Sequence, residues 1–328
     1  MRKEITKEKE TMRAVTLESF DNSPELHEVP TPQIAPNEVL VRVHASSINA
    51  FDVAVGAGML QGMMEYEFPV TIGRDLAGVV EQVGSEVSRY QVGDEVFGFL
   101  GTPVLHQGTW ADYVASPEDM FVAPKPASLG FLEAGALPTA GVAALMSIDA
   151  LDPSDGERVL VVGATGGVGS YAVQLAAKRG AKVIATARSE DEDYLRDLGA
   201  AETIDYTEGD VVSVIRERYP EGIEGLADFA NYPGGFAPFA ELCAPGGRVA
   251  STLGAADAEG LAATEVRATN IMGTPDPALL NRLAELADSG ELRVPVQRTF
   301  SLKEAPEGLD VFQREHVLGK FAISVATA

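Results

Sequence analysis

Residues 159–170 read VLVVGATGGVGS, and this stretch decides the fold of the chain. A short aliphatic run leads directly into four glycines, and a helical pattern follows them. Glycine at such a turn lets backbone N–H groups approach a pyrophosphate closely, and the start of the next helix favours an anion. No Lys-Ser or Lys-Thr pair follows the glycines, so a P-loop is excluded. We therefore predict a dinucleotide site at Gly163, Ala164, Gly166, Gly167, Val168 and Gly169.

The segments around this loop alternate between strand and helix patterns. Near-continuous apolar runs are joined by stretches with helical spacing, such as residues 170–180 and 191–200. Strands buried on both faces and connected by helices form a parallel sheet, so we expect a doubly wound α/β domain over residues 128–275. The expected strands are residues 158–163, 181–187, 201–206, 226–231 and 247–254, followed by an apolar edge strand at 266–271.

The rest of the chain has a pattern of short strands and turns. Residues 38–43 alternate between apolar and polar, and residues 75–84 and 92–101 are apolar runs punctuated by glycine. The proline-containing stretch at 122–130 marks the first boundary. We expect one β-rich domain made of residues 12–127 and 276–328, with the α/β domain inserted between them and residues 1–11 as a disordered tail.

The composition limits the classes of function. The 328 residues include 49 acidic and 25 basic side chains, which gives a formal net charge of −24. This charge repels phosphate backbones and anionic lipid, so nucleic-acid and membrane partners are disfavoured. Cys243 is the only cysteine, which excludes an internal disulfide and a multi-thiolate metal site. No apolar run approaches the ~20 residues that span a bilayer, and we expect a soluble, cytoplasmic protein.

The residues after the second strand of the α/β domain indicate which dinucleotide binds. An NAD site normally has an acidic residue at this strand end, whereas this chain has Ala187, Arg188 and Ser189. A guanidinium there would bind a 2′-phosphate through charge-assisted hydrogen bonds, so Arg188 and Ser189 predict NADPH as the cofactor. The alternative is that Arg188 is a solvated residue that pairs with the acidic run at 190–193.

Two further stretches carry a resemblance to a known family. Residues 72–98, IGRDLAGVVEQVGSEVSRYQVGDEVFG, resemble a glycine-spaced segment of the medium-chain dehydrogenase/reductase superfamily. Residues 164–176, ATGGVGSYAVQLA, are similar to the signature of its zinc-independent, zeta-crystallin-like quinone oxidoreductases, with Gln174 in place but Ala177 where a basic residue is expected. The resemblance runs from about residue 12 to residue 325 and implies a GroES-like catalytic domain beside a Rossmann domain with a parallel sheet.

The chain departs from the zinc-dependent branch of that superfamily. The positions that supply cysteine, histidine and cysteine to a catalytic zinc look like Asn49, Arg74 and a residue near Thr139. Asparagine is a poor ligand for zinc and arginine is none, so three protein ligands are not available. We therefore expect an enzyme without a metal ion.

The resemblance also implies which residues surround the acceptor. Asn49 would lie beside the nicotinamide and offer its side-chain amide to the substrate carbonyl, unless it is a turn asparagine that satisfies its own backbone. Tyr66 is the candidate to replace a tyrosine that some relatives have at the position of Ala54. The family threonine that contacts nicotinamide is Ala143 here, so Thr139 or backbone would contact the carboxamide instead.

Further cofactor contacts are expected from the same resemblance. Tyr206 matches a tyrosine that contacts the adenosine phosphate in relatives, although it is also explained as a strand-end aromatic. Lys320 either closes over the cofactor or is a surface lysine. Leu253 and Gly254 complete the expected cofactor-binding set.

These features predict a reductase. Without zinc, an alkoxide lacks its usual stabilisation, whereas a quinone or enone that accepts hydride spreads charge onto a carbonyl oxygen, for which hydrogen-bond donors suffice. Because the proton can come from water, we expect structural roles for Asp52 and Asp75, with Asp75 pairing with an arginine or capping a turn. We predict an NADPH-dependent reductase of quinones or α,β-unsaturated carbonyls that forms a homodimer through its edge strand. The alternatives are an alkenal or enoyl double-bond reductase, and a non-catalytic NADPH-binding protein with a structural or sensing role.

Overall fold

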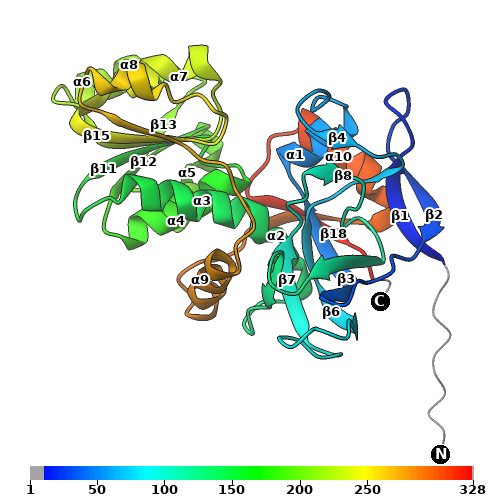
Figure 1. The fold of residues 1–328 in the computed structure, drawn as a ribbon. Helices are drawn as coiled ribbons and strands as arrows, with labels where there is room; N and C mark the ends of the chain where they lie inside the picture. Colours follow the sequence, from blue (N-terminus) through cyan, green and yellow to red (C-terminus); the bar gives the residue numbers. More distant parts are fainter. Residues whose placement is uncertain (1–10, 327–328) are drawn as a thin grey trace, which may run out of the picture.

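The structure is a computed structural model, and it describes residues 11–326. Figure 1 shows two lobes side by side, one built on a parallel sheet flanked by helices and the other rich in β-strands. The predicted fold class is therefore confirmed. The predicted tail lies outside the described residues except for Thr11, which is the first residue of strand β1 (Thr11–Leu17).

The α/β lobe is a Rossmann domain. Its parallel sheet has the strand order β13-β12-β11-β14-β15-β16 within the described part of the chain. Helices α3 and α4 cover one face, and α6, α7 and α8 cover the other (Figure 1). The strands are β11 (Arg158–Val162), β12 (Lys182–Ala187), β13 (Glu202–Asp205), β14 (Ile223–Asp228), β15 (Cys243–Ser251) and β16 (Arg267–Asn270). The helices are α3 (Pro138–Leu151), α4 (Gly167–Lys178), α5 (Glu192–Asp197), α6 (Val211–Arg218), α7 (Pro233–Ala240) and α8 (Ala258–Ala262), with a 3₁₀ turn, η1, at Ser189–Asp191.

Strand β11 explains why the apolar runs in this domain are nearly continuous. Val159 and Val161 belong to the hydrophobic core on one face of the sheet, and Leu160 and Val162 belong to the core on the other. Successive side chains of a strand point to opposite faces, so a sheet covered on both sides needs apolar residues at every position.

The edge strand differs from the prediction. We expected an apolar strand at 266–271, but β16 has the sequence RATN, in which Arg267, Thr269 and Asn270 are exposed. The apolar residues that flank it, Val266 and Ile271, are buried in the domain. The sequence pattern was misleading because the apolar residues at the two ends of the strand pack into the core of the domain, whereas the strand itself is polar.

The β-rich lobe is a GroES-like domain. Its main sheet has the order β10-β7-β6-β3-β18-β17, with β9 paired to β3, and smaller sheets pair β2-β1-β5 and β4-β8. Its strands, besides β1, are β2 (Glu25–Pro30), β3 (Glu38–Ile48), β4 (Glu65–Tyr66), β5 (Val70–Thr71), β6 (Asp75–Val83), β7 (Glu95–Phe99), β8 (Val104–Leu105), β9 (Tyr113–Pro117), β10 (Val122–Pro124), β17 (Val296–Ser301) and β18 (Lys320–Ser324). The remaining helices are α1 (Ala50–Gly56), α2 (Phe131–Ala136), α9 (Pro277–Asp288) and α10 (Ala305–Arg314), with the 3₁₀ turn η2 at Leu302–Glu304.

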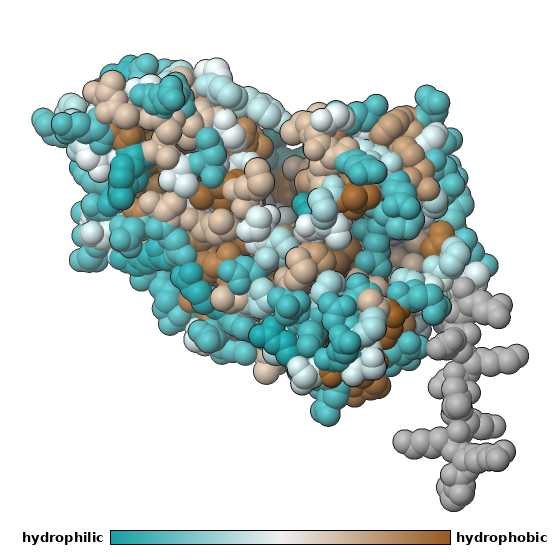
Figure 2. Space-filling model, viewed as in Figure 1, coloured by the Kyte–Doolittle hydropathy of each residue, from teal (hydrophilic) through white to brown (hydrophobic). Residues whose placement is uncertain are grey.

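The C-terminal strands return to the β-rich lobe after the Rossmann domain. Strand β18 pairs antiparallel with β3, so that Phe321 lies opposite Ile48. This pairing brings Lys320, at the start of β18, close to the residues that follow β3. Figure 2 shows a recess between the two lobes on this side of the molecule. The residue boundaries that we gave for the domains remain predictions.

Candidate active site

The glycine loop joins β11 to α4 and lies at the edge of the sheet where the strands end. Gly163 has a φ of 75°, a left-handed conformation that residues with a Cβ rarely adopt. A Cβ on Gly169 would lie 2.1 Å from the carbonyl oxygen of Gly163, so only glycine allows the helix to start this close to the strand. Gly166 faces open space, because the only atom near a Cβ built on it is the Gly163 oxygen at 3.6 Å. A pyrophosphate fits this opening, where the first N–H groups of α4 lack helical partners.

Two segments to which the sequence analysis gave no contact with this loop enclose it. A Cβ on Gly163 would lie 3.3 Å from the Cβ of Ala230, in the turn after β14. The N–H of Gly319 donates to the carbonyl oxygen of Thr165 at 2.7 Å, which ties the segment before β18 to the loop. The first contact follows from strand order, because β14 lies next to β11, whereas the second depends on how the two domains meet.

The other residues predicted for this part of the site lie at the same sheet edge. Ala164 is fully buried within the loop, and Val168 is partly buried in the first turn of α4. Leu253 and Gly254 follow β15, where the N–H of Leu253 donates to the Ser251 hydroxyl at 3.2 Å. Gly254 has a φ of 67° and open space around it. The structure thus brings the predicted dinucleotide residues to one edge.

Arg188, Ser189 and Tyr206 gather at the ends of β12 and β13. The Nε of Arg188 donates to the Tyr206 hydroxyl at 3.1 Å, and its Nη1 lies 3.6 Å from a Glu190 carboxylate oxygen. Ser189 is already engaged, since its N–H and hydroxyl donate to one oxygen of Asp205 at 2.7 and 2.5 Å. These bonds from Ser189, with those from Thr207, hold the pKa of Asp205 well below its usual range. A 2′-phosphate would have to replace Asp205 as the partner of Ser189, and the sequence analysis missed this carboxylate.

A buried polar cluster centred on Asp75 lies between the two domains. One carboxylate oxygen accepts from the Ser47 hydroxyl at 2.5 Å and from the side-chain amide of Asn49 at 2.9 Å. The other accepts from the N–H and the hydroxyl of Thr139 at 2.8 and 2.5 Å. Because Thr139 is in the first turn of α3, Asp75 caps that helix, as one of our two expectations for it proposed. The ion-pair partner of Asp75 is Lys320, at 3.7 Å, and not an arginine, which was our other expectation.

Lys320 connects this cluster to the glycine loop. Only 2% of the residue is exposed, so the prediction that it is a surface lysine is wrong. Its Nζ donates to the carbonyl oxygen of Ile48 at 3.2 Å and to the amide oxygen of Asn49 at 2.5 Å. A Cβ on Gly167 would lie 2.8 Å from its Cδ, so its stem passes directly beneath the first turn of α4. Burial lowers the pKa of Lys320, and the carboxylates of Asp75 and Asp52 oppose this effect.

The side chain of Asn49 is held inside the cluster. Its amide nitrogen donates to Ser47 and Asp75 and its oxygen accepts from Lys320, so each polar atom has a protein partner. Asn49 is also the N-cap residue of α1, where it forms a capping box with Asp52, so both of our expectations for it stay predictions. For the predicted role, the amide nitrogen of Asn49 would have to exchange one of its acceptors, Ser47 or Asp75, for a substrate carbonyl.

Tyr66 lies outside the cluster. Its ring packs edge-on against Phe20 with centroids 4.9 Å apart, and its hydroxyl donates to the carbonyl oxygen of Val55 at 3.4 Å. Burial raises the pKa of Tyr66. Tyr66 thus supports the end of α1. Among the described residues, Tyr66 and Asn49 do not form a hydrogen bond with each other.

Asp52, three residues after Asn49, is almost completely buried. One of its oxygens accepts from the N–H of Asn49 at 2.7 Å, and the other has no hydrogen-bond partner among the described residues. Burial, followed by the nearby charge of Asp75, raises the pKa of Asp52 to about 7. This carboxyl group changes its charge near neutral pH.

The three positions that we matched to zinc ligands do not form a donor set. Asn49 and Thr139 both bond to Asp75, whereas Arg74 donates from its Nε to the carbonyl oxygen of Leu100 at 2.7 Å. Among residues 11–326, no group of three or more His, Cys, Asp or Glu side chains is placed to hold a metal ion.

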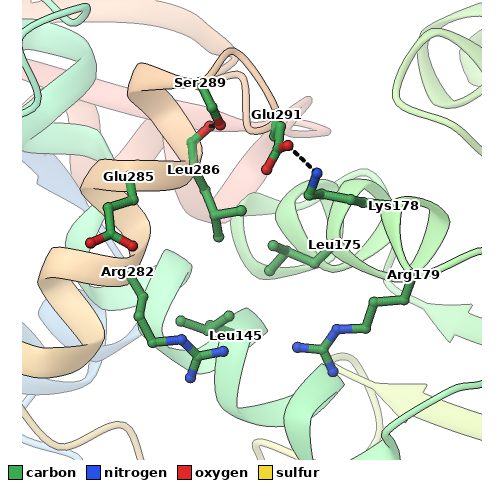
Figure 3. Close-up of a pocket in the computed structure, with 9 residues that line it drawn as sticks. All are labelled: Leu145, Leu175, Lys178, Arg179, Arg282, Glu285, Leu286, Ser289 and Glu291. Atoms are coloured by element: carbon green, nitrogen blue, oxygen red, sulfur yellow. Dashed lines mark hydrogen bonds and ion pairs between the residues drawn. The ribbon is translucent and has the colours of Figure 1, made fainter.

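A cavity of about 450 Å³ lies away from this region, between α3, α4 and α9 (Figure 3). Its cations are already paired: Lys178 with Glu291, and both Arg179 and Arg282 with Asp149. This cavity therefore offers no free cation to an anionic ligand, and the region beside the glycine loop is the better candidate for the active site.

The chain joins a GroES-like domain to a Rossmann domain, and a polar cluster lies between the two. This pair of domains defines the medium-chain dehydrogenases/reductases, and the chain belongs to this superfamily of oxidoreductases. Residues 35–127 match the alcohol dehydrogenase GroES-like domain, and residues 167–273 match the family described as zinc-binding dehydrogenase. The resemblance drawn from the sequence is thus confirmed.

The relatives include proteins named for NAD(P)H and for quinones. The mitochondrial NAD(P)H oxidoreductase RTN4IP1 of Mus musculus is 31% identical over 88% of this chain and 82% of its own length. The chloroplastic quinone-oxidoreductase QR1 of Triphysaria versicolor is 30% identical over 90% of this chain and 92% of its own. The structure of the quinone oxidoreductase from Coxiella burnetii superposes with a TM-score of 0.86 at 29% identity, covering 96% of this chain and all of that one.

Within residues 11–326, the helices are too short or too polar to cross a bilayer. Because the two relatives above are named mitochondrial and chloroplastic, a cytoplasmic location stays a prediction.

Proposed function

We propose that this chain is an NADPH-dependent reductase that delivers hydride to quinones or α,β-unsaturated carbonyls without a metal ion. The observation that carries the proposal is the unbroken contact from Gly167 through the stem of Lys320 to Asn49. This contact places hydrogen-bond donors next to the loop predicted to hold the dinucleotide. The names of the relatives support the substrate class, and Arg188 supports the choice of NADPH.

The roles of the residues follow from this arrangement. The bound dinucleotide would supply a hydride, and the acceptor would take one proton from water, at oxygen for a quinone and at the α-carbon for an enone, so one acceptor is reduced for each dinucleotide oxidised. Lys320 and Asp75 fix the amide of Asn49, and the α4 N-terminus with Gly163, Gly166 and Gly169 binds the pyrophosphate. Arg188 and Tyr206 bind the 2′-phosphate, and Thr139, whose hydroxyl donates to Asp75, accepts from the carboxamide through its Oγ1.

The test is the initial rate of NADPH oxidation with 1,4-benzoquinone and with cyclohexenone, with hydroquinone and cyclohexanone measured as products. We expect product to equal the NADPH consumed. A larger kcat/KM for cyclohexenone would favour the double-bond reductase. NADPH binding without reduction of either acceptor would leave the non-catalytic NADPH-binding protein and contradict the proposal.

A further inference from the structure

Arg74 occupies a fixed position next to the polar cluster. Its backbone carbonyl accepts from the N–H of Leu100 at 2.9 Å, and its Nε donates back to the Leu100 carbonyl at 2.7 Å. The carbon at the centre of its guanidinium lies 4.0 Å from the centroid of the Phe51 ring. Stacking and the Nε bond together hold the plane of the guanidinium, while the edge that carries Nη1 and Nη2 remains available.

The two terminal nitrogens of Arg74 have no partner within the part of the chain that the structure describes. Nε makes the only hydrogen bond of this side chain there, and no carboxylate forms an ion pair with it. Arg74 is only partly exposed, and a cation withdrawn from water is usually paired. Burial lowers the pKa of Arg74, and the charges of Asp52 and Asp75 oppose this effect, but arginine stays protonated. An unpaired, immobilised cation therefore needs an anionic or strongly polar partner from outside the chain.

This cation faces a small cavity at the start of α1. Arg74, Asp52 and Phe51 line the cavity together with the apolar side chains of Val55, Leu100 and Leu105 and the polar side chains of Thr71, Thr102 and Gln107. Its volume is about 20 Å³, which holds one water-sized group, so it can accept a single oxygen but not a ring. Since Asp75 follows Arg74 and binds Asn49, the cavity adjoins the cluster that we assign to the acceptor.

Asp52 does not cancel the positive charge of this cavity. Its pKa, raised to about 7 by burial and by Asp75, leaves a large fraction of the carboxyl group neutral near neutral pH. The oxygen without a partner is a hydroxyl or carbonyl oxygen in the neutral form and a carboxylate oxygen in the ionised form. Of the residues that line this cavity, Arg74 is the one that stays fully charged near neutral pH, whereas Asp52 is only partly ionised there.

We propose that Arg74 binds the oxygen of the acceptor that becomes negatively charged, and that the guanidinium stabilises this oxyanion. The inference rests on the proposed function and adds a catalytic residue to it. A quinone or enone would place one carbonyl oxygen in the cavity, with its ring or chain in the cleft outside. The fork of Nη1 and Nη2 supplies donors that need no reorganisation as charge develops.

Binding of 4-nitrophenol tests this assignment without turnover. Its phenolate matches the oxygen of a hydroquinone anion, and its visible absorption reports the charge of the bound form. With NADP⁺ present, we expect the wild type to bind the phenolate and to lower the apparent pKa of the phenol.

Arg74→Met should bind the phenolate about tenfold or more weakly and lose the pKa shift. Arg74→Lys should be intermediate, because it keeps the charge but not the fork. Arg89→Met, at an exposed arginine of the same domain, is the matched control and should equal the wild type.

The kinetics separate this inference from the proposed function. With 1,4-benzoquinone, Arg74→Met should lower kcat/KM by about 10²–10³-fold while the Kd for NADPH stays unchanged. If the wild type binds phenolate through Arg74 but reduces no acceptor, the proposed function fails and the anion site stands. If the wild type reduces quinone and Arg74→Met is equally active and still binds phenolate, the assignment of Arg74 is overturned. Should Arg74→Met not fold, an Arg74→Lys enzyme indistinguishable from the wild type in both assays would overturn it as well.

Discussion

The side chain of Lys320 shows how single residues connect the two domains. Its stem lies beneath Gly167 of the dinucleotide loop, and its Nζ bonds to Asn49 in the GroES-like domain. A buried lysine is tolerated here because two oxygens accept hydrogen bonds from its ammonium group and Asp75 lies 3.7 Å away. Any shift of the loop is thus transmitted directly to the amide that we assign to the acceptor.

Arg188 gives a prediction about cofactor choice. Its guanidinium is exposed at the carboxyl end of β12 and is held by Tyr206 and Glu190, so a 2′-phosphate can compete for it. Arg188→Ala should weaken the binding of NADPH by roughly tenfold to a hundredfold and leave that of NADH nearly unchanged. Fluorescence titration with both dinucleotides measures this, with Arg196→Ala, at an arginine paired to Glu192, as the control. Equal losses for the two cofactors would show that Arg188 does not bind the phosphate.

Asp52 gives a prediction about pH. Its pKa is about 7 in the folded chain, above the ordinary value of 3.8, because burial and Asp75 penalise the ionised form. A raised folded-state pKa contributes stability below the ordinary value, and this is lost as the pH rises through the folded value. Asp52→Asn keeps an oxygen for the N–H of Asn49 but removes the titration.

Urea unfolding at about pH 5 and about pH 8 measures the effect. Relative to the wild type, Asp52→Asn should gain about 1 kcal/mol or more of unfolding free energy between the two values. Asp119→Asn, at an exposed position, controls for the loss of one negative charge. A parallel pH dependence of Asp52→Asn and the wild type would contradict the assigned pKa.

At the scale of elements, the glycines of the loop meet two different requirements, close packing of the backbone and space for a ligand. The sequence pattern does not distinguish them. Gly169 is required by the fold, because a Cβ there would lie 2.1 Å from the Gly163 oxygen. Gly166 is not, because a Cβ there has only that oxygen near it, at 3.6 Å. The open space at Gly166 is where we expect the pyrophosphate.

Alanine substitutions distinguish these two glycines. Gly169→Ala should lower the unfolding free energy by ~1–3 kcal/mol or more, because backbone atoms must move. Gly166→Ala should leave the Tm of the free protein nearly unchanged but weaken NADPH binding, because its methyl group occupies the proposed anion site. Thermal unfolding and fluorescence titration of both variants provide the measurement. Tight NADPH binding by Gly166→Ala would place the pyrophosphate elsewhere.

The fold was predictable from the sequence because the apolar pattern and the order of the strands along the chain can be read from local stretches of sequence. Continuous apolar runs such as residues 159–162 imply a sheet covered on both faces, and glycine spacing implies the turn after β11. The site was only partly predictable. The contacts of Lys320 with Asn49, of Gly319 with Thr165 and of Ser189 with Asp205 depend on how distant segments pack, which spacing along the chain does not encode.

At the scale of the whole molecule, strand β16 leaves one edge of the parallel sheet unpaired within the described residues. Exposed polar residues on this strand limit its hydrophobic contribution, but the backbone donors and acceptors still favour pairing with a second strand. We therefore retain the homodimer as a prediction that rests on the backbone edge alone.

Light scattering tests this prediction. We expect a mass about twice the 34.6 kDa of one chain. Thr269→Lys, at an exposed position of β16, should shift the protein toward the monomer, because paired strands would bring two lysines together. A wild-type particle of 34.6 kDa would reject the dimer.

The central claim is that hydride reaches a conjugated acceptor without a metal ion. The most direct measurement compares NADPH oxidation by the dialysed enzyme with that by enzyme treated with EDTA, using 1,4-benzoquinone and cyclohexenone as acceptors. We predict equal rates before and after chelation and no increase on addition of zinc. Activity that disappears with EDTA and returns with stoichiometric zinc would contradict the account.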